Sequence, residues 1–445
     1  MGSGRLSTAQ GTALYVGAVL GTGVVALPAL AAKAAGPASL IAWAGLVVLS
    51  VPLAATFAAL GSRYPDSGGV STYARRAFGE LAGVLVGWCF YFAVPVGAPA
   101  AALFGGAYVS AATGGGSITT TATAAALTLA VAVMNAAGLS VSARAQFVLA
   151  GVLLVLLVGS VALSLPDARA ANLRPFDPHG WLAVGSAGAL LVWSFAGWEA
   201  ITHLAAEFRR PARDLPRATG AAVVVVGVLY LAVAFATVAV LGPSAADSSA
   251  PLGDLMARGL GGPARVLAAV VAVLLTLGTM NAYFAGAAKL GAALGRDGAL
   301  PAWLARGSVA GEVPRRSLGL LSGLAFVALA VVAATHVSVR PLVLLTTALL
   351  VAVYAVGVAA AVRLLPLRTR AGTAALAALA AVGLLLAMSG PYLLLPLLLG
   401  TGAAAYVHGR RRRAARLGSG GLLQAGRREL DDDTVPTLTV RRSEA

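Results

Sequence analysis

Long apolar runs separated by short polar segments form the pattern of this chain. A run of about 20 apolar residues has the length that an α-helix needs to cross a bilayer. The pattern predicts twelve such spans, at residues 9–32, 38–60, 80–110, 119–138, 146–165, 181–205, 218–242, 263–286, 317–337, 341–363, 371–389 and 391–408. Only Ser389, Gly390 and Pro391 separate the last two, so eleven spans is the alternative. We therefore predict an all-α polytopic membrane protein, with a transmembrane domain over residues 1–408.

The composition supports this prediction and excludes other classes. Hydrophobic residues make up 59% of the chain and charged residues only 11%, far from the quarter that is usual in soluble domains. A net charge of +16 would suit nucleic acid, but the basic residues lie in short loops and one tail, so we expect a lipid bilayer and no nucleic-acid partner. A single cysteine, Cys89, and four scattered histidines argue against a disulfide framework or a metal centre. We expect neither a metal nor another cofactor.

The distribution of basic residues predicts the orientation. If the N-terminus is cytoplasmic, all but six of the 32 Lys and Arg residues fall in cytoplasmic loops or in the C-terminal tail. The six others are Lys33, Arg169, Arg174, Arg258, Arg265 and Arg340. This asymmetry predicts a multi-pass protein of the bacterial inner membrane with both termini in the cytoplasm. The polar segment 409–445 is expected to be a disordered tail.

One acidic residue stands apart from the other fifteen. Glu199 lies deep in a predicted span, whereas the others lie in loops, at span ends or in the tail. An ionised carboxylate at mid-membrane costs roughly 2.5–3.5 kcal/mol, so such a residue usually has a function. Glu199, His203 and Glu207 are spaced to share one helical face, which favours a role in proton coupling or gating. In the alternative, Glu199 only caps or hydrogen-bonds the broken segment and stays fixed. We expect Glu207 to pair with Arg209 or Arg213 at the cytoplasmic surface, as a structural residue or part of a gate.

Two spans contain signals for a break in the helix. The first span carries Gly21-Thr22-Gly23 followed by Pro28, and the sixth carries Gly185 and then Ser194 to Gly197. Glycine weakens a helix by about 1 kcal/mol relative to alanine, and irregular backbone at membrane depth survives only inside protein or beside a cavity. Interrupted spans at matching places in two halves predict an inverted-repeat transporter with its site at the breaks. The alternative is close helix packing by small residues.

The breaks and the eighth span supply the candidate binding groups. Free N–H groups at a half-helix start would suit the carboxylate of an amino acid, and aromatic rings enclose apolar ligands, although rings in a span often simply pack. Asn281 and Tyr283 add polar groups; Thr276 and Thr279 rank lower because threonine can bond to its own helix. The predicted substrate-binding residues are Gly21, Thr22, Gly23, Trp193, Ser194, Phe195, Ala196, Gly197, Trp198, Asn281 and Tyr283. We predict no catalytic residues, because no nucleophile accompanies the Glu199–His203 pair.

Three stretches carry a resemblance to a known family. Gly21–Pro28 resembles the element G-[ST]-G-[IV]-F-x-x-P, and Tyr64–Gly79 resembles Y-P-x-x-G-G followed by F-G. Phe195–Glu199 with Glu207–Ala218 resembles F-x-G-x-E followed by E-x-K-N-P-x-R-x-[IF]-P-R-A. Order and spacing agree over the first two thirds of the chain. The sequence thus resembles the amino acid–polyamine–organocation (APC) permeases.

Further elements are similar to those of the bacterial exporters of methionine and branched-chain amino acids. Pro95–Pro99 matches P-V-G-x-P, and Glu199–Phe208 matches E-A-x-x-H-L-A-x-E-F. Met280 replaces the leucine of an L-N-x-Y element, and Trp198 replaces a smaller aliphatic residue, which puts the size of the pocket in question.

The resemblance implies a LeuT-type fold. Two inverted five-helix repeats would cover residues 9–165 and 181–363, and two extra helices would follow over 371–408. The substrate would lie between spans 1, 3, 6 and 8.

The absence of charge in spans 3, 8 and 10 favours neutral, apolar substrates such as Met, Leu, Ile or Val. We expect a secondary transporter, not an enzyme, that exports these amino acids by alternating access. The expected coupling ion is the proton. Sodium is the other candidate, although span 5 lacks the lysine that is thought to replace sodium in some related permeases. Uptake or exchange by the same fold, or a non-transporting sensor or subunit, are the alternatives. The sequence leaves open whether the protein is a monomer or a homodimer.

Overall fold

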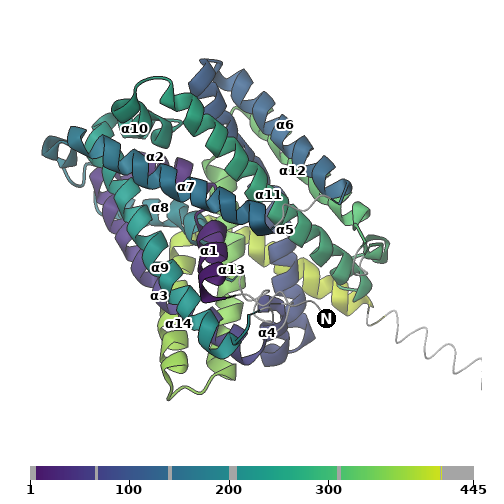
Figure 1. Ribbon diagram of the computed structural model, residues 1–445. Coiled ribbons are helices and arrows are strands. Elements are labelled where there is room, and N and C mark those ends of the chain that lie inside the picture. Colours follow the sequence, from purple (N-terminus) through teal and green to yellow (C-terminus); the bar gives the residue numbers. More distant parts are fainter. Residues whose placement is uncertain are drawn as a thin grey trace, which may run out of the picture.

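A computed structural model describes residues 7–65, 69–138, 143–199, 208–307, 312–410 and 412, and helices dominate it (Figure 1). The helices are α1 (Thr8–Val19), α2 (Gly23–Ala35), α3 (Ser39–Arg63), α4 (Gly69–Phe78), α5 (Glu80–Thr113), α6 (Gly116–Ala136), α7 (Ala143–Ser164), α8 (Leu182–Leu191), α9 (Pro211–Ala236), α10 (Pro251–Leu260), α11 (Ala264–Arg296), α12 (Arg315–Thr335), α13 (Arg340–Leu364) and α14 (Arg370–Ser389). A last helical segment covers residues 394–410. Among the described residues, each of the twelve predicted spans contains helix, although the helical part of the sixth ends at Phe195 and residues 200–205 lie outside the description. The chain is an all-α polytopic membrane protein.

The two predicted interruptions are confirmed. The first span divides into α1 and α2, with Leu20 to Thr22 between them. The sixth span begins as α8 and tightens into a 3₁₀ turn over Val192–Phe195. Ala196 is then extended and Gly197 has a φ of 118°, a conformation that favours glycine. Both breaks therefore lie where glycine is dense in the sequence.

The end of the bundle contains two helices rather than one. Gly390, with a φ of 51°, ends α14 and opens a 3₁₀ turn over Gly390–Leu393. Helix α14 packs against α3 and α13, whereas the segment over 394–410 reaches α5, where Tyr406 lies 6.2 Å from the ring of Trp88. The last two predicted spans therefore form separate helices.

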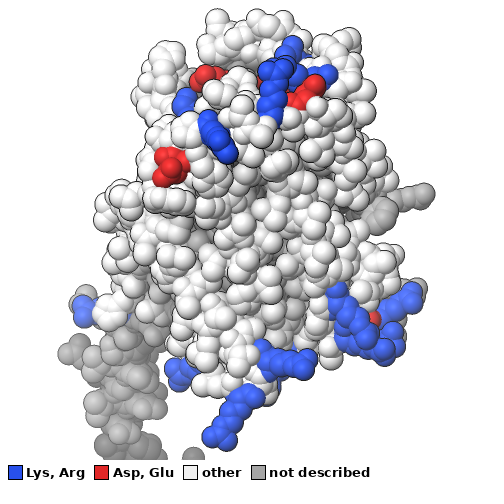
Figure 2. Space-filling view, turned by 90° about the vertical axis from the view of Figure 1, so that its left-hand side faces the viewer, with Lys and Arg blue, Asp and Glu red and all other residues white. Residues whose placement is uncertain are grey.

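Charge and length both fit a membrane environment. Eight helical stretches of the described chain are long and apolar enough to cross a bilayer, and two shorter apolar helices accompany them. Figure 2 shows charged side chains at the two ends of the molecule and a broad uncharged band between them. Helix α4 lies at one end and α10 at the other (Figure 1).

Helix α5 runs through the interior of the bundle and contacts many of its helices. It contacts α4, α6, α11, α12 and α13, and it contains Pro95 and Pro99. Each proline removes one backbone donor from the helix, which leaves carbonyl groups of the preceding turn without their helical partner. This weakened part of α5 faces the two breaks.

Candidate functional site

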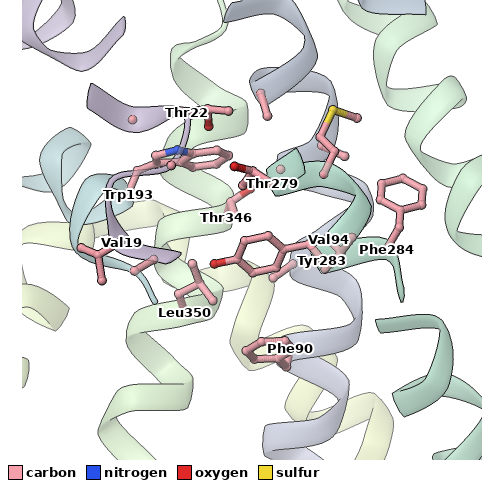
Figure 3. A pocket seen from close by; sticks show the side chains of 18 residues that line it. Val19, Thr22, Phe90, Val94, Trp193, Thr279, Tyr283, Phe284, Thr346 and Leu350 are labelled. Carbon is pink, nitrogen blue, oxygen red and sulfur yellow. The ribbon is translucent and has the colours of Figure 1, made fainter. Parts of the chain in front are cut away.

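A cavity of about 680 Å³, counting the solvent space that opens into it, lies beside the two breaks (Figure 3). It is lined by Val19, Gly21, Thr22, Gly23, Phe90, Ala93, Val94, Gly97, Ala98, Ala101, Trp193, Ala196, Thr279, Met280, Tyr283, Phe284, Thr346 and Leu350. These residues come from both breaks and from α5, α11 and α13. None of these eighteen residues is charged.

The two breaks touch each other at Gly23 and Ser194. A Cβ atom on Gly23 would lie 2.4 Å from Ser194 Oγ and 3.0 Å from Ser194 Cα, so only glycine fits there. Tyr230 of α9 holds the same junction, because its hydroxyl lies 2.7 Å from the carbonyl oxygens of both Val19 and Ser194. The breaks therefore form one packed unit.

Trp193 forms one wall of the cavity. Its ring atoms lie 3.1 Å from the positions that Cβ atoms would take at Gly23 and at Gly97, so the indole fits between α2 and α5 because both residues are glycines. Phe104 meets the same ring edge to face, with the ring centroids 6.3 Å apart. Gly97 belongs to the Pro95–Pro99 motif, which was the signal in the sequence for this wall.

The polar groups of the cavity are hydroxyls. Figure 3 shows the Tyr283 hydroxyl pointing across the cavity toward Leu350 and Val19, with Thr279 and Thr346 near Trp193. Thr346 was missed in the sequence, although Thr346-Thr347 is a polar pair in an otherwise apolar span. Thr279 was ranked below Asn281, yet it is Thr279 that lines the cavity.

Asn281 serves a different contact. Its side-chain oxygen accepts a hydrogen bond from Asn135 of α6 at 2.7 Å, and the residue is only 2% exposed. Asn281 therefore joins α11 to α6 and does not line the cavity.

Trp198 also points away from the cavity. It is fully buried, its ring lies 5.6 Å from that of Tyr15, and its carbonyl accepts a hydrogen bond from the Tyr15 hydroxyl. The conformation of Gly197 turns the chain between Ala196, which lines the cavity, and Trp198, which packs against α1.

Glu199 is buried and hydrogen-bonded at the second break. Its Oε2 atom accepts hydrogen bonds from the Tyr354 hydroxyl of α13 at 2.5 Å and from the Gly197 N–H at 3.0 Å. Tyr354 in turn packs on Phe57 of α3, with the ring centroids 5.7 Å apart. The carboxylate thus connects the unwound segment to α13 and does not itself line the cavity.

The predicted binding residues therefore divide into three sets. Those that line the cavity are Gly21, Thr22, Gly23, Trp193, Ala196 and Tyr283. Those placed behind its wall are Ser194, Gly197, Trp198 and Asn281. The side chain of Phe195, and His203 and Glu207 entirely, lie outside the described residues. Among the residues that are described, no cluster of three or more His, Cys, Asp or Glu side chains could hold a metal ion.

An uncharged cavity where two interrupted helices meet inside an apolar bundle is the arrangement of a membrane transport protein. Comparison with known proteins agrees. Residues 6–398 match the family model described as amino acid permease.

Curated relatives support the same assignment. The chain is 34% identical to the uncharacterized amino acid permease YecA of Bacillus subtilis (strain 168), over 90% of this chain and 94% of that protein. It is 32% identical to the L-methionine/branched-chain amino acid exporter YjeH of Escherichia coli (strain K12), over 88% and 96%. A probable GABA permease of Pseudomonas aeruginosa is 30% identical over about half of each chain. The chain belongs to the amino acid permease family of the APC superfamily.

Proposed function

We propose that this protein exports neutral, apolar amino acids such as Met, Leu, Ile or Val across the bacterial inner membrane by alternating access, linked to protons. The observation that carries the proposal is the cavity between the two breaks, because none of the described residues that line it is charged and could pair with a charged side chain. Burying an unpaired charge there would be costly, so cationic and anionic amino acids are disfavoured.

The start of α2 is the proposed position of the substrate carboxylate. The first N–H groups of a helix have no partner within it and attract anions, and Thr22 provides no side-chain cap for α2. The Ser194 hydroxyl beside Gly23 is buried and has no hydrogen-bond partner among the described residues.

The opposite wall is the proposed position of the apolar side chain. Phe90, Val94, Phe284 and Leu350 are apolar residues of the lining, and Phe90 and Leu350 lie on the side away from Thr22 (Figure 3). Hydrophobic surfaces of this kind favour an aliphatic or thioether side chain over a polar one. The thioether of methionine is polarizable and suits contact with aromatic rings.

Glu199 is the proposed proton-coupling residue. A carboxylate at membrane depth is costly when ionised, so its protonation changes the balance of the conformations that bury it differently. Its hydrogen bonds reach both Gly197 at the break and Tyr354 of α13. Protonation would weaken these bonds and free the unwound segment to move against α13.

The arrangement of helices suggests the repeat structure. We propose that residues 9–165 and 181–363 form two inverted five-helix repeats of the LeuT type, with residues 371–408 as additional helices. The supporting observation is that the broken first helix of each half meets its counterpart at the cavity. The asymmetry of basic residues supports cytoplasmic termini.

Transport into everted membrane vesicles tests the function. With an imposed pH gradient, we expect labelled methionine and leucine to accumulate, and excess unlabelled isoleucine or valine to compete while lysine and glutamate do not. A vesicle preparation with the Gly23→Ala variant is the control for endogenous carriers. If no neutral amino acid is transported in vesicles of either orientation, the proposal is wrong.

Uptake or exchange by the same site is the second candidate. One relative is named as an exporter of methionine and branched-chain amino acids, and another as a probable GABA permease. The direction of transport and the substrate therefore have to be determined by experiment. Accumulation only in right-side-out vesicles would indicate uptake. Flux that requires amino acid on both sides would indicate exchange. A partner that co-purifies in fixed ratio with a chain lacking flux would indicate a sensor or subunit.

A further inference from the structure

Tyr108 joins two parts of the molecule that are far apart in sequence. It lies near the end of α5 and is 1% exposed. Its hydroxyl lies 2.5 Å from the carbonyl oxygen of Val25, to which it donates, and it accepts a hydrogen bond from the Leu252 N–H at 3.1 Å. One hydroxyl thus bonds both α2 and α10.

Both partners of Tyr108 occupy the first turn of a helix. Val25 is in the turn of α2 that begins at Gly23, where the two breaks touch. Leu252 follows Pro251 at the start of α10, where backbone N–H groups have no partner within the helix. Tyr108 therefore caps α10 and at the same time ties it to the helix that borders the cavity.

Helix α10 covers one end of the bundle, opposite α4 (Figure 1). It buries Leu252, Leu255 and Met256. Its outer side is fixed to the start of α11 by the Asp254–Arg265 ion pair at 3.1 Å. Because α10 and α11 are consecutive in the chain, this ion pair does not tie α10 to a distant part of the bundle. The two helices can therefore move as one unit.

The route from the cavity to α10 is filled by packed side chains. Ala101 lines the cavity, and Gly105 and Tyr108 follow one and two turns further along α5. A Cβ atom on Gly105 would lie 2.9 Å from Oγ1 of Thr276, so α5 and α11 are in contact at this level. Tyr108 and Thr276 are also almost fully buried, so the described chain is tightly packed between the cavity and α10.

We propose that Tyr108 is a positioning residue that holds this end of the transporter closed by clasping α10 to the first turn of α2. The proposal rests on the proposed function, because alternating access requires this end to open. Separating α2 or α10 from α5 breaks at least one of the two hydrogen bonds. The hydroxyl therefore favours the closed end over the open one.

A thiol-accessibility experiment tests the clasp. The parent carries Cys89→Ala and the reporter Ala101→Cys, and a membrane-impermeant maleimide is applied, without substrate, to right-side-out and everted vesicles. We expect Tyr108→Phe to raise the labelling rate from the α10 side by roughly fivefold, the change in population that losing one ordinary hydrogen bond produces, and to lower it from the other side.

Tyr91→Phe is the matched control. Tyr91 is a buried tyrosine of the same helix whose hydroxyl bonds instead to Ser317 of α12, at 3.2 Å. We expect its labelling to equal that of the parent. The proposal is overturned if Tyr108→Phe labels like the parent from both sides, or if Tyr91→Phe gives the same increase. Labelling needs no substrate, so a failure of the transport assay leaves this result interpretable on its own.

Discussion

The two breaks reach similar depth in the bundle by different means. The first opens between α1 and α2 without any residue of positive φ among Leu20, Gly21 and Thr22, and it presents its short segment and the start of α2 to the cavity. In the second break the chain turns at Gly197, which has a φ of 118°, and the Glu199 side chain folds back to accept a hydrogen bond from the Gly197 N–H. The first break lines the cavity from Gly21 to Gly23, whereas the second does so only at Trp193 and Ala196.

The division within the second break separates two tasks. Trp193 and Ala196 face the cavity, while Trp198 and Glu199 are fixed to Tyr15 and Tyr354 behind it. Two tryptophans five residues apart thus have different surroundings. We therefore expect that contact with the cavity and attachment to the bundle can be altered separately, which substitutions at six positions can examine.

Gly23→Ala should have the largest effect, because it disturbs the point where the breaks meet. The added Cβ would lie 3.0 Å from the Cα atom of Ser194, which is backbone and cannot rotate away. Overpacking of this kind costs about 1–3 kcal/mol, and we expect transport to fall to the background of empty vesicles. Gly185→Ala in α8, with no atom within 4 Å, should keep the parent rate. Parental flux in Gly23→Ala would contradict the packed junction.

Glu199→Gln should remove proton coupling and preserve the fold. Glutamine keeps a carbonyl oxygen that can accept from Tyr354 and Gly197 but carries no titratable proton. We expect pH-gradient-driven transport to fall about tenfold, with substrate affinity nearly unchanged. Flux as a function of imposed gradient, and binding by calorimetry on purified protein, measure the two quantities. Asp247→Asn, at an exposed position, is the control, and an unaltered pH dependence in Glu199→Gln would reduce that residue to a structural role.

The tryptophan pair should respond in opposite ways. We expect Trp193→Leu to raise the KM for methionine about tenfold and to admit larger side chains such as phenylalanine, because it removes a cavity wall. Trp198→Leu should instead lower stability by about 3 kcal/mol, since it empties buried space against Tyr15, and leave the KM of the folded protein close to the parent value. Transport kinetics and thermal melting in detergent distinguish the two. Equal KM changes would show that the break is not divided.

The smallest effect is expected for Asn281→Leu. Hydrogen bonds between membrane helices contribute about 0.6 kcal/mol on average, so losing the bond to Asn135 should lower the melting temperature slightly and leave the KM unchanged. Thr279→Val is the comparison on the same helix, and there we expect a threefold rise in KM or more with unchanged stability, because Thr279 lines the cavity. If the two variants exchange these phenotypes, the rotation of α11 differs from the one described.

The fold was predictable because its signals are strong along the chain. Apolar length defined the spans, and the glycines near Thr22 and before Glu199 marked both breaks, since irregular backbone at membrane depth needs a special environment. The faces of the helices were less predictable. Residues 279 and 281 are two positions apart and point to nearly opposite sides of a helix, but α11 is apolar around most of its circumference, so no polar stripe indicates which side faces the cavity.

The same limit applies to the second break and to α13. Trp193 and Trp198 could not be distinguished by type or depth, because only the turn at Gly197 separates their surroundings. Thr346 belongs to a helix that contributes to the cavity through long-range packing against α5, a contact between residues far apart in sequence. The sequence motifs indicated which segments border the cavity. Tertiary packing determines which residues of each motif line it.

The absence of charge on the cavity wall has an electrical consequence. Under the proposed function, a zwitterionic amino acid held there would add no net charge, so the coupling ion alone would set the charge that crosses in each cycle. One proton moved per cycle would make transport electrogenic and couple it to the membrane voltage at about 2.3 kcal/mol per 100 mV. Currents measured on supported membranes would then count the ions per substrate directly.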